Sequence, residues 1–307
     1  MAQPTVDFIW KNGELVKWDD AKVHVLTHGL HYGSGVFEGA RCYKTDEGPA
    51  IFRLREHMER LNRSATMMHM EIGYSVDEMC QAVIDVIREN KLDACYIRPL
   101  VYRGYGSMGV DPLAAPVEMF IAIWPWDSYL GEEALTKGVK VAVSSWRKHG
   151  VNSLPPAIKA AGNYVNSSFA KVEANRNGYS EAVLLNEEGR VCEGTGENLF
   201  IVKNGVLYTP PVSDGILEGI TRDSVMTLAR EAGVEVVERS MVRSELYTAD
   251  EFFMTGSAAE LVPVNSVDNI TVGSGVAGPI TQMLQKAYFD TVHGKNAEHA
   301  AWLTLVK

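Results

Sequence analysis

The segment 150-GVNSLPPAIKAAGNYVNSSFA-170 contains a single charged side chain, Lys159, in a chain of which 22% of the residues are charged. Its small and apolar neighbours are expected to remove water from the ammonium group, and desolvation favours the neutral, nucleophilic amine. Such an amine can form a Schiff base with a carbonyl compound. An ordinary surface lysine in a polar loop is the alternative, so other segments must decide between the two interpretations.

The composition indicates a globular protein without electrostatic attraction to nucleic acids. The chain has 307 residues, 46% of them hydrophobic, which is enough for one large or two smaller domains. The formal net charge is −10 and no cluster of Lys and Arg occurs, which argues against nucleic-acid binding. The four cysteines are spaced widely, as in reduced thiols. Without a signal-peptide pattern or a run of 18 apolar residues, we expect a cytoplasmic protein with no membrane segment.

Apolar periodicity predicts helices and strands in both halves of the chain. Asn12-Gly13 predicts the turn of a hairpin, and Ser75 and Glu78 form a capping-box pattern. We predict helices at residues 54–70, 75–90, 162–178, 221–232 and 279–292, and strands at 49–53, 94–102, 117–124, 139–144, 181–186, 199–202, 206–209, 234–239 and 251–255. This is a mixed α/β pattern, with a small domain at 1–125, a linker at 126–136 and a large domain at 137–307 that carries Lys159.

Two motifs point to other chemistry. Residues 104–109, GYGSMG, match the GxGxxG pattern of dinucleotide-binding folds, but that fold needs a helix next and two prolines follow closely. The second motif consists of His24, His28 and His31, which are spaced as in some metal sites. No Asp, Glu or Cys lies among them, so we expect structural histidines and no metal. A nicotinamide oxidoreductase remains the alternative from another enzyme class.

Three other segments suit an anionic ligand or a charged ring. Residues 193–198, EGTGEN, place Glu193 before a glycine-rich turn. The small glycines allow the carboxylate to enter a site where bulkier side chains would clash. Residues 217–222, LEGITR, place Gly219 just before a predicted helix, whose first amides and dipole can bind an anion. Residues 255–260, TGSAAE, follow a strand and offer a second set of amides. A surface turn and a plain helix N-cap are the alternatives for the first two.

A further segment contains an arginine in an apolar strand. Arg98 is the only charged side chain in residues 94–102, ACYIRPLVY. Burying an arginine is costly unless its charge is paired. Arg98 could bind the carboxylate of a ligand, or a protein acid in a buried ion pair, and the sequence leaves both open.

Taken together, these segments resemble the class IV aminotransferases. The spacing Glu193-x-Thr195-x-x-Asn198-Leu-Phe200, Leu207-x-Thr209 and Leu217-x-Gly219-Ile-x-Arg222 is similar to the signature of that family. The resemblance extends over nearly the whole chain, through residues 31–33 (HYG), 36–39 (VFEG), 96–99 (YIRP) and 159–164 (KAAGNY), and is strongest to the bacterial branched-chain amino acid aminotransferases. It implies fold type IV, with two α/β domains and pyridoxal 5'-phosphate at their interface.

The resemblance also implies roles for the cofactor-binding residues. Lys159 would be the catalytic residue, forming the Schiff base with pyridoxal phosphate and moving the proton between Cα and C4′. Glu193 would keep the pyridine nitrogen protonated, and Tyr164 would hydrogen-bond the ring oxygen. Arg60 would hold the phosphate, a choice over Arg55 and Arg63 that rests on the resemblance alone. The other implied cofactor-binding residues are Gly196, Leu217, Gly219, Ile220, Thr221, Gly256 and Ser257.

The implied reaction is ping-pong transamination between L-leucine, L-isoleucine or L-valine and 2-oxoglutarate, giving branched 2-oxo acids and L-glutamate. One pocket must therefore accept a branched aliphatic chain and a carboxylate in turn. Tyr96 and the amides of Ser257 and Ala258 would bind the α-carboxylate, and Arg98 the second carboxylate of glutamate. The apolar side chain would lie against Tyr32, Phe37, Tyr129 and Tyr164.

Other functions remain to be distinguished. D-amino acid aminotransferase and aminodeoxychorismate lyase share the fold, although residues 37–39 and 96–98 favour the branched-chain enzyme. A non-catalytic binding module would leave Lys159 and Glu193 without a role. The resemblance further implies a homodimer as the minimal unit, with hexamers also occurring in the family.

Overall fold

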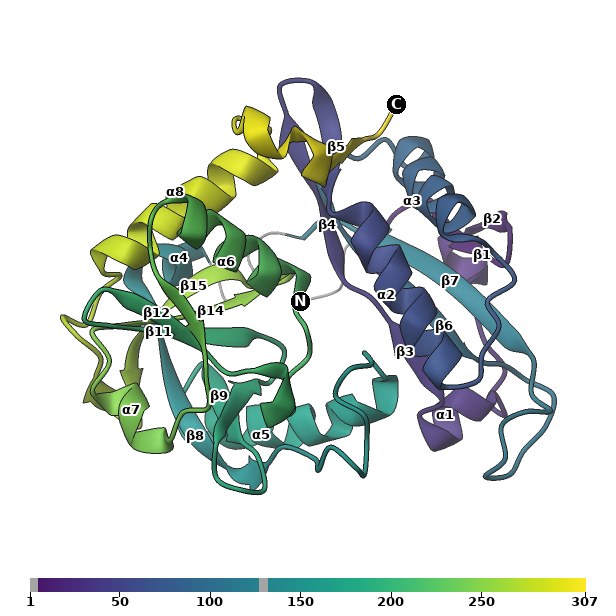
Figure 1. Ribbon diagram of the computed structural model, residues 1–307. Helices are drawn as coiled ribbons and strands as arrows, with labels where there is room; N and C mark the ends of the chain where they lie inside the picture. The colour runs from purple at the N-terminus through teal and green to yellow at the C-terminus, as the bar shows by residue number, and fades with distance from the viewer. Residues whose placement is uncertain (1–4, 127–131) are drawn as a thin grey trace. The chain divides into compact units, whose positions relative to one another are not determined.

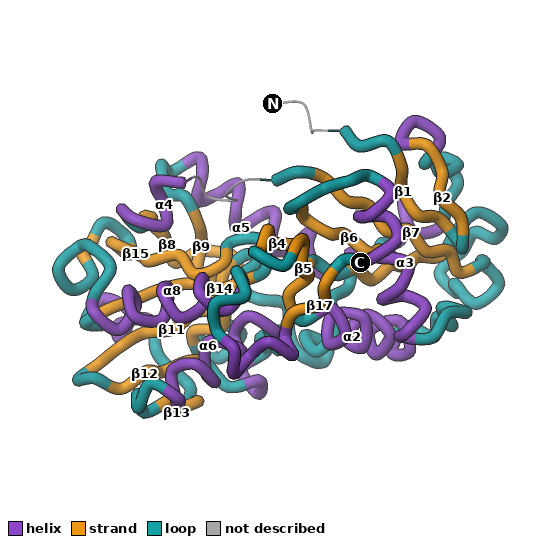
Figure 2. The backbone as a smooth tube through the Cα atoms, turned by 90° about the horizontal axis from the view of Figure 1, so that it is seen from above, coloured by secondary structure: helices purple, strands orange, loops and turns teal. Residues whose placement is uncertain are grey.

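In the computed structural model, which describes residues 5–126 and 132–307, helices and strands alternate irregularly in both halves of the chain (Figures 1 and 2). This confirms the predicted mixed α/β class. The chain divides into two units: Met1–Trp126 with Ile158–Gly162 and Thr291–Lys307, and Asp127–Ala157 with Asn163–Asp290. No helix in the described ranges has the length and apolar character that a membrane crossing requires. The four cysteines are free.

The first unit contains an antiparallel sheet with the strand order β17-β5-β4-β6-β7-β1-β2, and β3 pairs with β6. The predicted Asn12-Gly13 turn joins β1 to β2, and both residues have the positive φ that such a tight turn needs. The strands are β1 (Phe8–Lys11), β2 (Glu14–Lys17), β3 (Gly35–Phe37), β4 (Ala40–Thr45), β5 (Gly48–Phe52), β6 (Cys95–Arg103), β7 (Val117–Trp124) and β17 (Leu303–Leu305).

Two amphipathic helices pack on this sheet, and a short helix α1 (His28–Tyr32) precedes β3 (Figure 1). Helix α2 (Leu54–Met67) buries the predicted apolar stripe of Leu54, Met58, Leu61 and Ala65. Helix α3 (Val76–Glu89) begins at the predicted capping box, because Ser75 Oγ accepts from the Glu78 amide while the Glu78 carboxylate accepts from the Ser75 amide.

The second unit contains a mixed sheet with the order β10-β9-β8-β15-β14-β11-β12-β13, and β16 pairs with β15. Its strands are β8 (Val139–Arg147), β9 (Glu181–Leu185), β10 (Val191–Gly194), β11 (Asn198–Lys203), β12 (Val206–Thr209), β13 (Val236–Glu238), β14 (Glu251–Gly256), β15 (Glu260–Val267) and β16 (Ile270–Thr271). Its helices are α4 (Glu132–Lys137), α5 (Tyr164–Arg176), α6 (Ile220–Glu231), α7 (Arg243–Tyr247) and α8 (Pro279–Val292), the last of which ends in the first unit.

The structure differs from the predicted elements in ways that have local causes. The helix predicted at 54–70 ends at Met67, and His69 takes a positive φ that a helix cannot continue through. Strand β15 was not predicted. Most of its residues are buried, so its sequence, ELVPVNSV, does not alternate between apolar and polar residues, and it contains a proline.

The two units also differ from the expected domain ranges. Residues 158–162 belong to the first unit, since Ala160 bridges to Val36 and the Phe37 amide donates to the Lys159 carbonyl at 3.0 Å. The C-terminal residues 291–307 also belong there, and β17 pairs with β5 (Figure 2). Part of the predicted linker 126–136 lies outside the described residues, and its end forms α4. The limits 1–125 and 137–307 therefore stay predictions.

Candidate active site

Lys159 lies on a short segment at the edge of the first unit's sheet. Its amide donates to Ser64 Oγ at 3.3 Å, and its carbonyl accepts from Phe37. Ile158 and Ala160 on either side are buried, which leaves the Lys159 side chain partly buried, as its apolar neighbours predict. The Nζ atom lies 5.1 Å from the centre of the Phe37 ring. An amine in this setting loses part of its hydration, which favours nucleophilic chemistry.

Arg98 lies on the same face of β6 as Tyr96, two residues away. Its guanidinium is 4.8 Å from the centre of the Phe37 ring and donates to the Tyr96 hydroxyl at 3.3 Å. Its Nε is buried and has no hydrogen-bond partner in the described ranges, nor does any acid in those ranges form an ion pair with Arg98. Of the two roles left open for Arg98, this geometry favours binding of a ligand carboxylate.

Gly39 explains why the Tyr96 hydroxyl can take this position. A Cβ on Gly39 would lie 2.0 Å from the Tyr96 hydroxyl oxygen, so any larger residue would displace the ring. Tyr96 is otherwise held by a tilted ring contact with Trp124 and an edge contact with Trp126. The segment 37–39 and the strand β6 thus bring Phe37, Tyr96 and Arg98 together within the first unit.

Arg60, on α2, is buried in a bidentate ion pair. Its Nε and one terminal nitrogen donate to the Glu38 carboxylate at 2.6 and 2.9 Å, and His57 Nδ1 lies 2.8 Å from the same group. Burial by itself raises the pKa of Glu38, but Arg60 and His57 outweigh it and hold that pKa below its usual range. Burial also lowers the pKa of His57, so this ring is a neutral hydrogen-bond partner. Glu38 fixes Arg60; sequence reasoning gave Glu38 no role.

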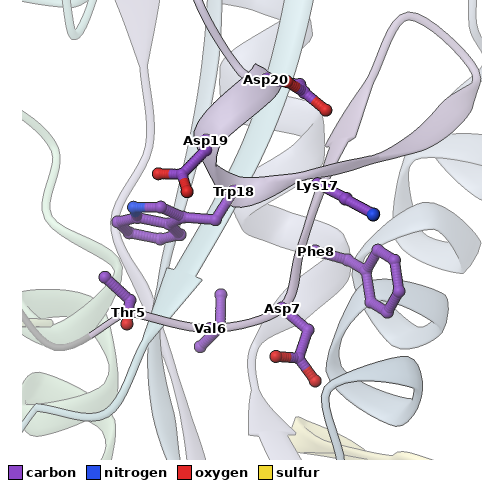
Figure 3. Close-up of a pocket in the computed structure, with 8 residues that line it drawn as sticks. All are labelled: Thr5, Val6, Asp7, Phe8, Lys17, Trp18, Asp19 and Asp20. Atoms are coloured by element: carbon purple, nitrogen blue, oxygen red, sulfur yellow. The ribbon is translucent and has the colours of Figure 1, made fainter.

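The remaining first-unit residues are more dispersed. Tyr32 ends α1 with 48% of its surface exposed and its ring 4.5 Å from that of His28. Tyr129 lies outside the described residues. A pocket of about 410 Å³ beside β6 and β7 is mainly apolar and is also lined by Arg98. Another pocket, of about 480 Å³, lies at residues 5–8 and 17–20 and involves none of the predicted site residues (Figure 3).

The structure bears on both competing motifs. Residues 104–116 contain no helix, so the GxGxxG pattern lacks the element that dinucleotide binding requires. His28 is buried, with Nδ1 2.6 Å from Ser34 Oγ and Nε2 2.7 Å from the Gly109 carbonyl. Both ring nitrogens are therefore engaged by protein groups.

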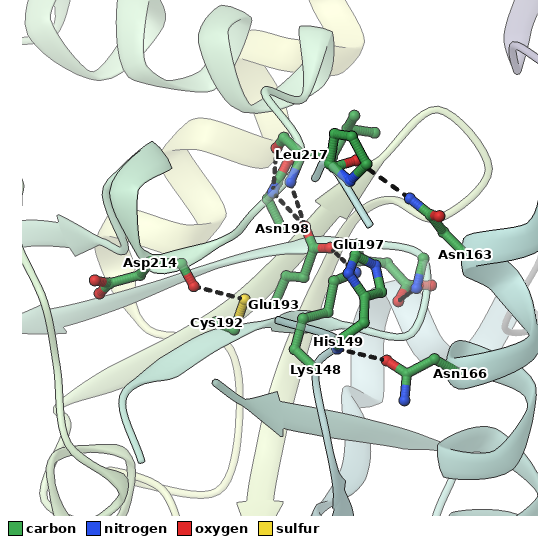
Figure 4. Close-up of polar contacts among 12 residues, drawn as sticks. Lys148, His149, Asn163, Asn166, Cys192, Glu193, Glu197, Asn198, Asp214 and Leu217 are labelled. Atoms are coloured by element: carbon green, nitrogen blue, oxygen red, sulfur yellow. Dashed lines mark hydrogen bonds and ion pairs between the residues drawn. The ribbon is translucent and has the colours of Figure 1, made fainter. Parts of the chain in front are cut away.

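In the second unit, Glu193 is the centre of a buried polar network on β10 (Figure 4). Its Oε1 accepts from Lys148 Nζ at 2.5 Å, and its Oε2 accepts from the Leu217 amide at 2.9 Å and from Asn198 Nδ2 at 3.3 Å. Three donors from three segments thus fix the position of this carboxylate. A fixed, buried anion of this kind suits a ligand with a protonated ring nitrogen.

Lys148 is a site residue that the sequence did not reveal. It is 8% exposed, and although burial opposes its charge, Glu193 raises the pKa of Lys148 above its ordinary value. It lies between Arg147 and His149, which can also carry a positive charge, so the local sequence does not distinguish Lys148 from an ordinary surface lysine. Asn198 belongs to the Glu193 motif and could be noticed in the sequence, but its hydrogen bonds to Glu193 and Leu217 could not be predicted from it.

The N-terminus of α6 forms beside this network. Gly219 is its N-cap, and a Cβ there would lie 1.9 Å from Asn198 Oδ1, so glycine is required at this position. Asn198 Nδ2 also donates to the Leu217 carbonyl at 2.9 Å, which holds the preceding residues in place. Ile220 and Thr221 are buried as the first residues of the helix, where the amides have no intrahelical partner. These amides suit an anion such as phosphate.

The turn after β14 packs against the Glu193 motif. A Cβ on Gly256 would lie 3.3 Å from the Gly196 carbonyl oxygen, so the two turns are in close contact. Ser257 and Ala258 follow in this turn and are partly buried. Thr255 Oγ1 is buried at the end of β14 with no hydrogen-bond partner within the described chain. An unsatisfied hydroxyl and the turn's amides again suit a ligand that accepts hydrogen bonds.

Tyr164 is the first residue of α5 and is partly buried. The second unit thus gathers Glu193, Gly196, Leu217, Gly219, Ile220, Thr221, Gly256 and the turn that follows into one neighbourhood, connected by the contacts above. Chemically, it offers a fixed carboxylate and two groups of backbone amides. The first unit offers a partly buried amine and an arginine in an aromatic setting.

Comparisons with known proteins agree with this chemistry. The model of the family described as amino-transferase class IV matches residues 35–267. A branched-chain-amino-acid aminotransferase of Pseudomonas aeruginosa is 52% identical over 299 residues, covering 97% of each chain. The crystal structure of the Escherichia coli branched-chain amino acid aminotransferase has a TM-score of 0.97 at 49% identity, over 99% of this chain and all of that one. The enzyme of Thermobaculum terrenum, solved in its PLP-form, has a TM-score of 0.93 at 40% identity, over 99% and 100% of the two chains.

Proposed function

Because this chain belongs to the class IV aminotransferases, we propose that it transfers the amino group between L-leucine, L-isoleucine or L-valine and 2-oxoglutarate, with pyridoxal 5'-phosphate as its cofactor. The observation that carries the proposal is the Glu193 carboxylate, buried and fixed by three donors. The relatives, similar along their full length and named branched-chain-amino-acid aminotransferases, support the substrate class.

The residues present fit this cofactor. Glu193 suits the protonated ring nitrogen, and the amides at Ile220, Thr221 and the Gly256 turn suit the phosphate, as do the unpartnered Thr255 hydroxyl within the described chain and the charge of Arg60. The PLP-form of the Thermobaculum terrenum enzyme supports the same assignment. When bound, pyridoxal phosphate supplies an electron sink for negative charge that develops at the amino acid Cα.

The chain's own groups perform the remaining tasks. Lys159 Nζ, which is partly desolvated, would be the amine that holds the cofactor and moves the proton at the substrate Cα. Glu193 keeps the ring nitrogen protonated, and Lys148 keeps Glu193 in place. Tyr164 would hydrogen-bond the ring oxygen, and the backbone of Gly196, Leu217 and Gly219 would lie beside the ring.

Substrate recognition is proposed for the first unit and the Ser257 turn. Tyr96 and the amides of Ser257 and Ala258 bind the α-carboxylate. Arg98, whose Nε lacks a partner within the described chain, accepts the second carboxylate of glutamate, and Phe37 offers an apolar surface beside it. The apolar side chain would also contact Tyr32, Tyr129 and Tyr164. A homodimer as the minimal unit and a cytoplasmic location stay predictions that the resemblance implies.

The test is the visible absorption spectrum of the purified protein with L-leucine and then 2-oxoglutarate. We expect a yellow protein whose band shifts with leucine and returns with 2-oxoglutarate, because the cofactor stores the amino group between half-reactions. Lys159→Ala should lose turnover, whereas Lys140→Ala, an exposed lysine on β8, should retain it. A colourless protein that takes up no pyridoxal phosphate contradicts the proposal. Activity with D-alanine in place of L-leucine would favour the D-amino acid aminotransferase.

A further inference from the structure

Glu197 contacts two proposed cofactor-binding residues, Gly196 in its own glycine-rich turn and Gly256 at the end of β14. Its side chain folds back, so that Oε2 accepts from the Gly196 amide at 3.0 Å. A Cβ on Gly194 would lie 2.7 Å from Oε2, which shows how tightly the turn closes around the carboxyl group. On the other side, a Cβ on Gly256 would lie 3.7 Å from Glu197 Cγ. Glu197 therefore fills the space between the turn at 194–196 and the turn after β14.

The charges around Glu197 are already balanced without it. Glu181 on β9 accepts from Lys171 Nζ at 2.6 Å and from Thr195 Oγ1 at 2.7 Å, and Glu193 is paired with Lys148. Each of these two carboxylates has its own lysine. No ammonium or guanidinium group in residues 5–126 or 132–307 donates a hydrogen bond to Glu197, which is 5% exposed. A third buried negative charge would be uncompensated, which is costly unless the group takes up a proton.

The direction of the pKa shift of Glu197 agrees with this geometry. Burial, and next the negative charge of Glu181, raise the pKa of Glu197 to about 8. Glu193 adds to this rise, while Lys171 and the Gly196 amide oppose it. The charged neighbours that act on Glu197 thus come from β9, β10 and α5, and the neighbour from β14 is the uncharged Gly256.

We propose that Glu197 is a positioning residue that, as a neutral carboxylic acid, holds the turn at 194–196 against Gly256 and so sets the backbone that binds the cofactor. The neutral state follows from the two lysine–carboxylate pairs that surround it. The role of Glu197 in binding pyridoxal phosphate rests on the proposed function, whereas its charge state is independent of that function.

A distinctive pH dependence of stability follows. An ordinary glutamate titrates at about 4.5, and Glu197 in the folded protein titrates at about 8. Between these values the folded state holds one proton more than the unfolded state, so this group makes stability fall as pH rises from about 4.5 to about 8, with no further loss above. Glu197→Gln keeps the shape and the acceptor for the Gly196 amide but has no charge to form.

The first arm compares thermal unfolding of the wild type, Glu197→Gln and the control Glu188→Gln, an exposed glutamate of the same unit. We expect Glu197→Gln to melt close to the wild type at pH 5 and several degrees above it at pH 9. Glu188→Gln should follow the wild type at both values. If the difference in melting temperature between Glu197→Gln and the wild type were the same at pH 5 and pH 9, Glu197 would already be ionised at pH 5. That result would overturn the neutral-acid proposal.

The second arm titrates the apoproteins with pyridoxal phosphate and follows binding by absorbance. We expect Glu197→Ala to raise the dissociation constant about tenfold, by analogy with the loss of residues that orient metal ligands. Glu197→Gln should bind as the wild type does at pH 7, because its side chain still fills the turn. Binding by Glu197→Ala as tight as that of the wild type would refute the positioning role. A wild type that binds no pyridoxal phosphate contradicts the proposed function, and the thermal comparison still decides the charge state.

Discussion

At the scale of single residues, the site depends on which buried charges have partners. Glu193 and Lys148 are both almost fully buried and lie 2.5 Å apart, so each removes the electrostatic penalty of burying the other. Arg60 and Glu38 form a second such pair in the first unit. Arg98 differs, since its Nε has no protein partner among the described residues. The proposed cofactor-binding charges Arg60 and Glu193 are thus held by protein partners, whereas the buried Arg98 Nε, the group proposed for substrate recognition, has none among the described residues.

Lys148→Met should destabilise the protein by about 3–5 kcal/mol, because it leaves the Glu193 carboxylate buried without its cation. The free energy of unfolding in urea measures this loss. Lys148→Arg should recover most of it, since a guanidinium can donate to the same oxygen. Lys140→Met, at an exposed position on β8, the strand that ends just before Lys148, should change stability little. Equal effects of the Lys148 and Lys140 variants would mean that the buried pair contributes no net stability.

At the scale of secondary structure elements, the start of α6 shows how a helix terminus is fitted to its surroundings. The helix begins at a glycine whose missing side chain leaves room for Asn198, and Asn198 in turn links Glu193 to the Leu217 carbonyl. The glycine is therefore needed for space rather than for a special backbone angle, since its φ is −69°. The first amides of α6, which we propose as phosphate ligands, and the Glu193 carboxylate are positioned by the same side chain.

Gly219→Ala should cost about 1–3 kcal/mol of stability, because the added Cβ would lie 1.9 Å from Asn198 Oδ1 and force one of the two to move. Urea unfolding of both single variants and of the double variant with Asn198→Ala tests the cause. In the Asn198→Ala background, the alanine at 219 should cost clearly less, since the clashing oxygen is gone. Strictly additive losses would show that the contact with Asn198 is not the reason for the glycine.

At the scale of the whole molecule, the chain begins and ends in the first unit. Strand β17 forms the edge of the first sheet by pairing with β5, and the Arg53 amide donates to the Trp302 carbonyl at 2.7 Å. The Trp302 ring packs on Phe52 with ring centres 5.9 Å apart and on His299 at 3.8 Å. The first unit therefore depends on residues that lie far from the rest of it in sequence.

Trp302→Ala should lower stability by about 2 kcal/mol, less than for a fully buried tryptophan because Trp302 is partly exposed. Hydrogen exchange should show the loss first at the amides of β5, which pair with β17. Lys295→Ala, an exposed residue just before the same segment, serves as the control and should leave exchange unchanged. If protection were lost equally in both units, β17 would not be a local part of the first one.

Much of this protein was determined by local sequence. The hairpin at Asn12-Gly13, the buried stripe of α2 and the capping box at Ser75 follow from rules that act within a few residues, so the sequence alone predicted them. The motif at Glu193 and the glycine at 219 were also evident, because small residues in fixed spacing leave a visible pattern. The resemblance to class IV aminotransferases rests on that spacing.

Only the tertiary structure decided which charges meet. Lys148 and Glu193 are 45 residues apart, Arg60 and Glu38 are 22 apart, and no local rule connects the members of either pair. The same holds for Glu197, whose charged neighbours come from three other elements, and for residues 158–162, which join the first unit although the residues on either side belong to the second. The partner of a charged side chain cannot be identified from the sequence around it, because the energy of an ion pair depends on the distance and burial that long-range packing creates.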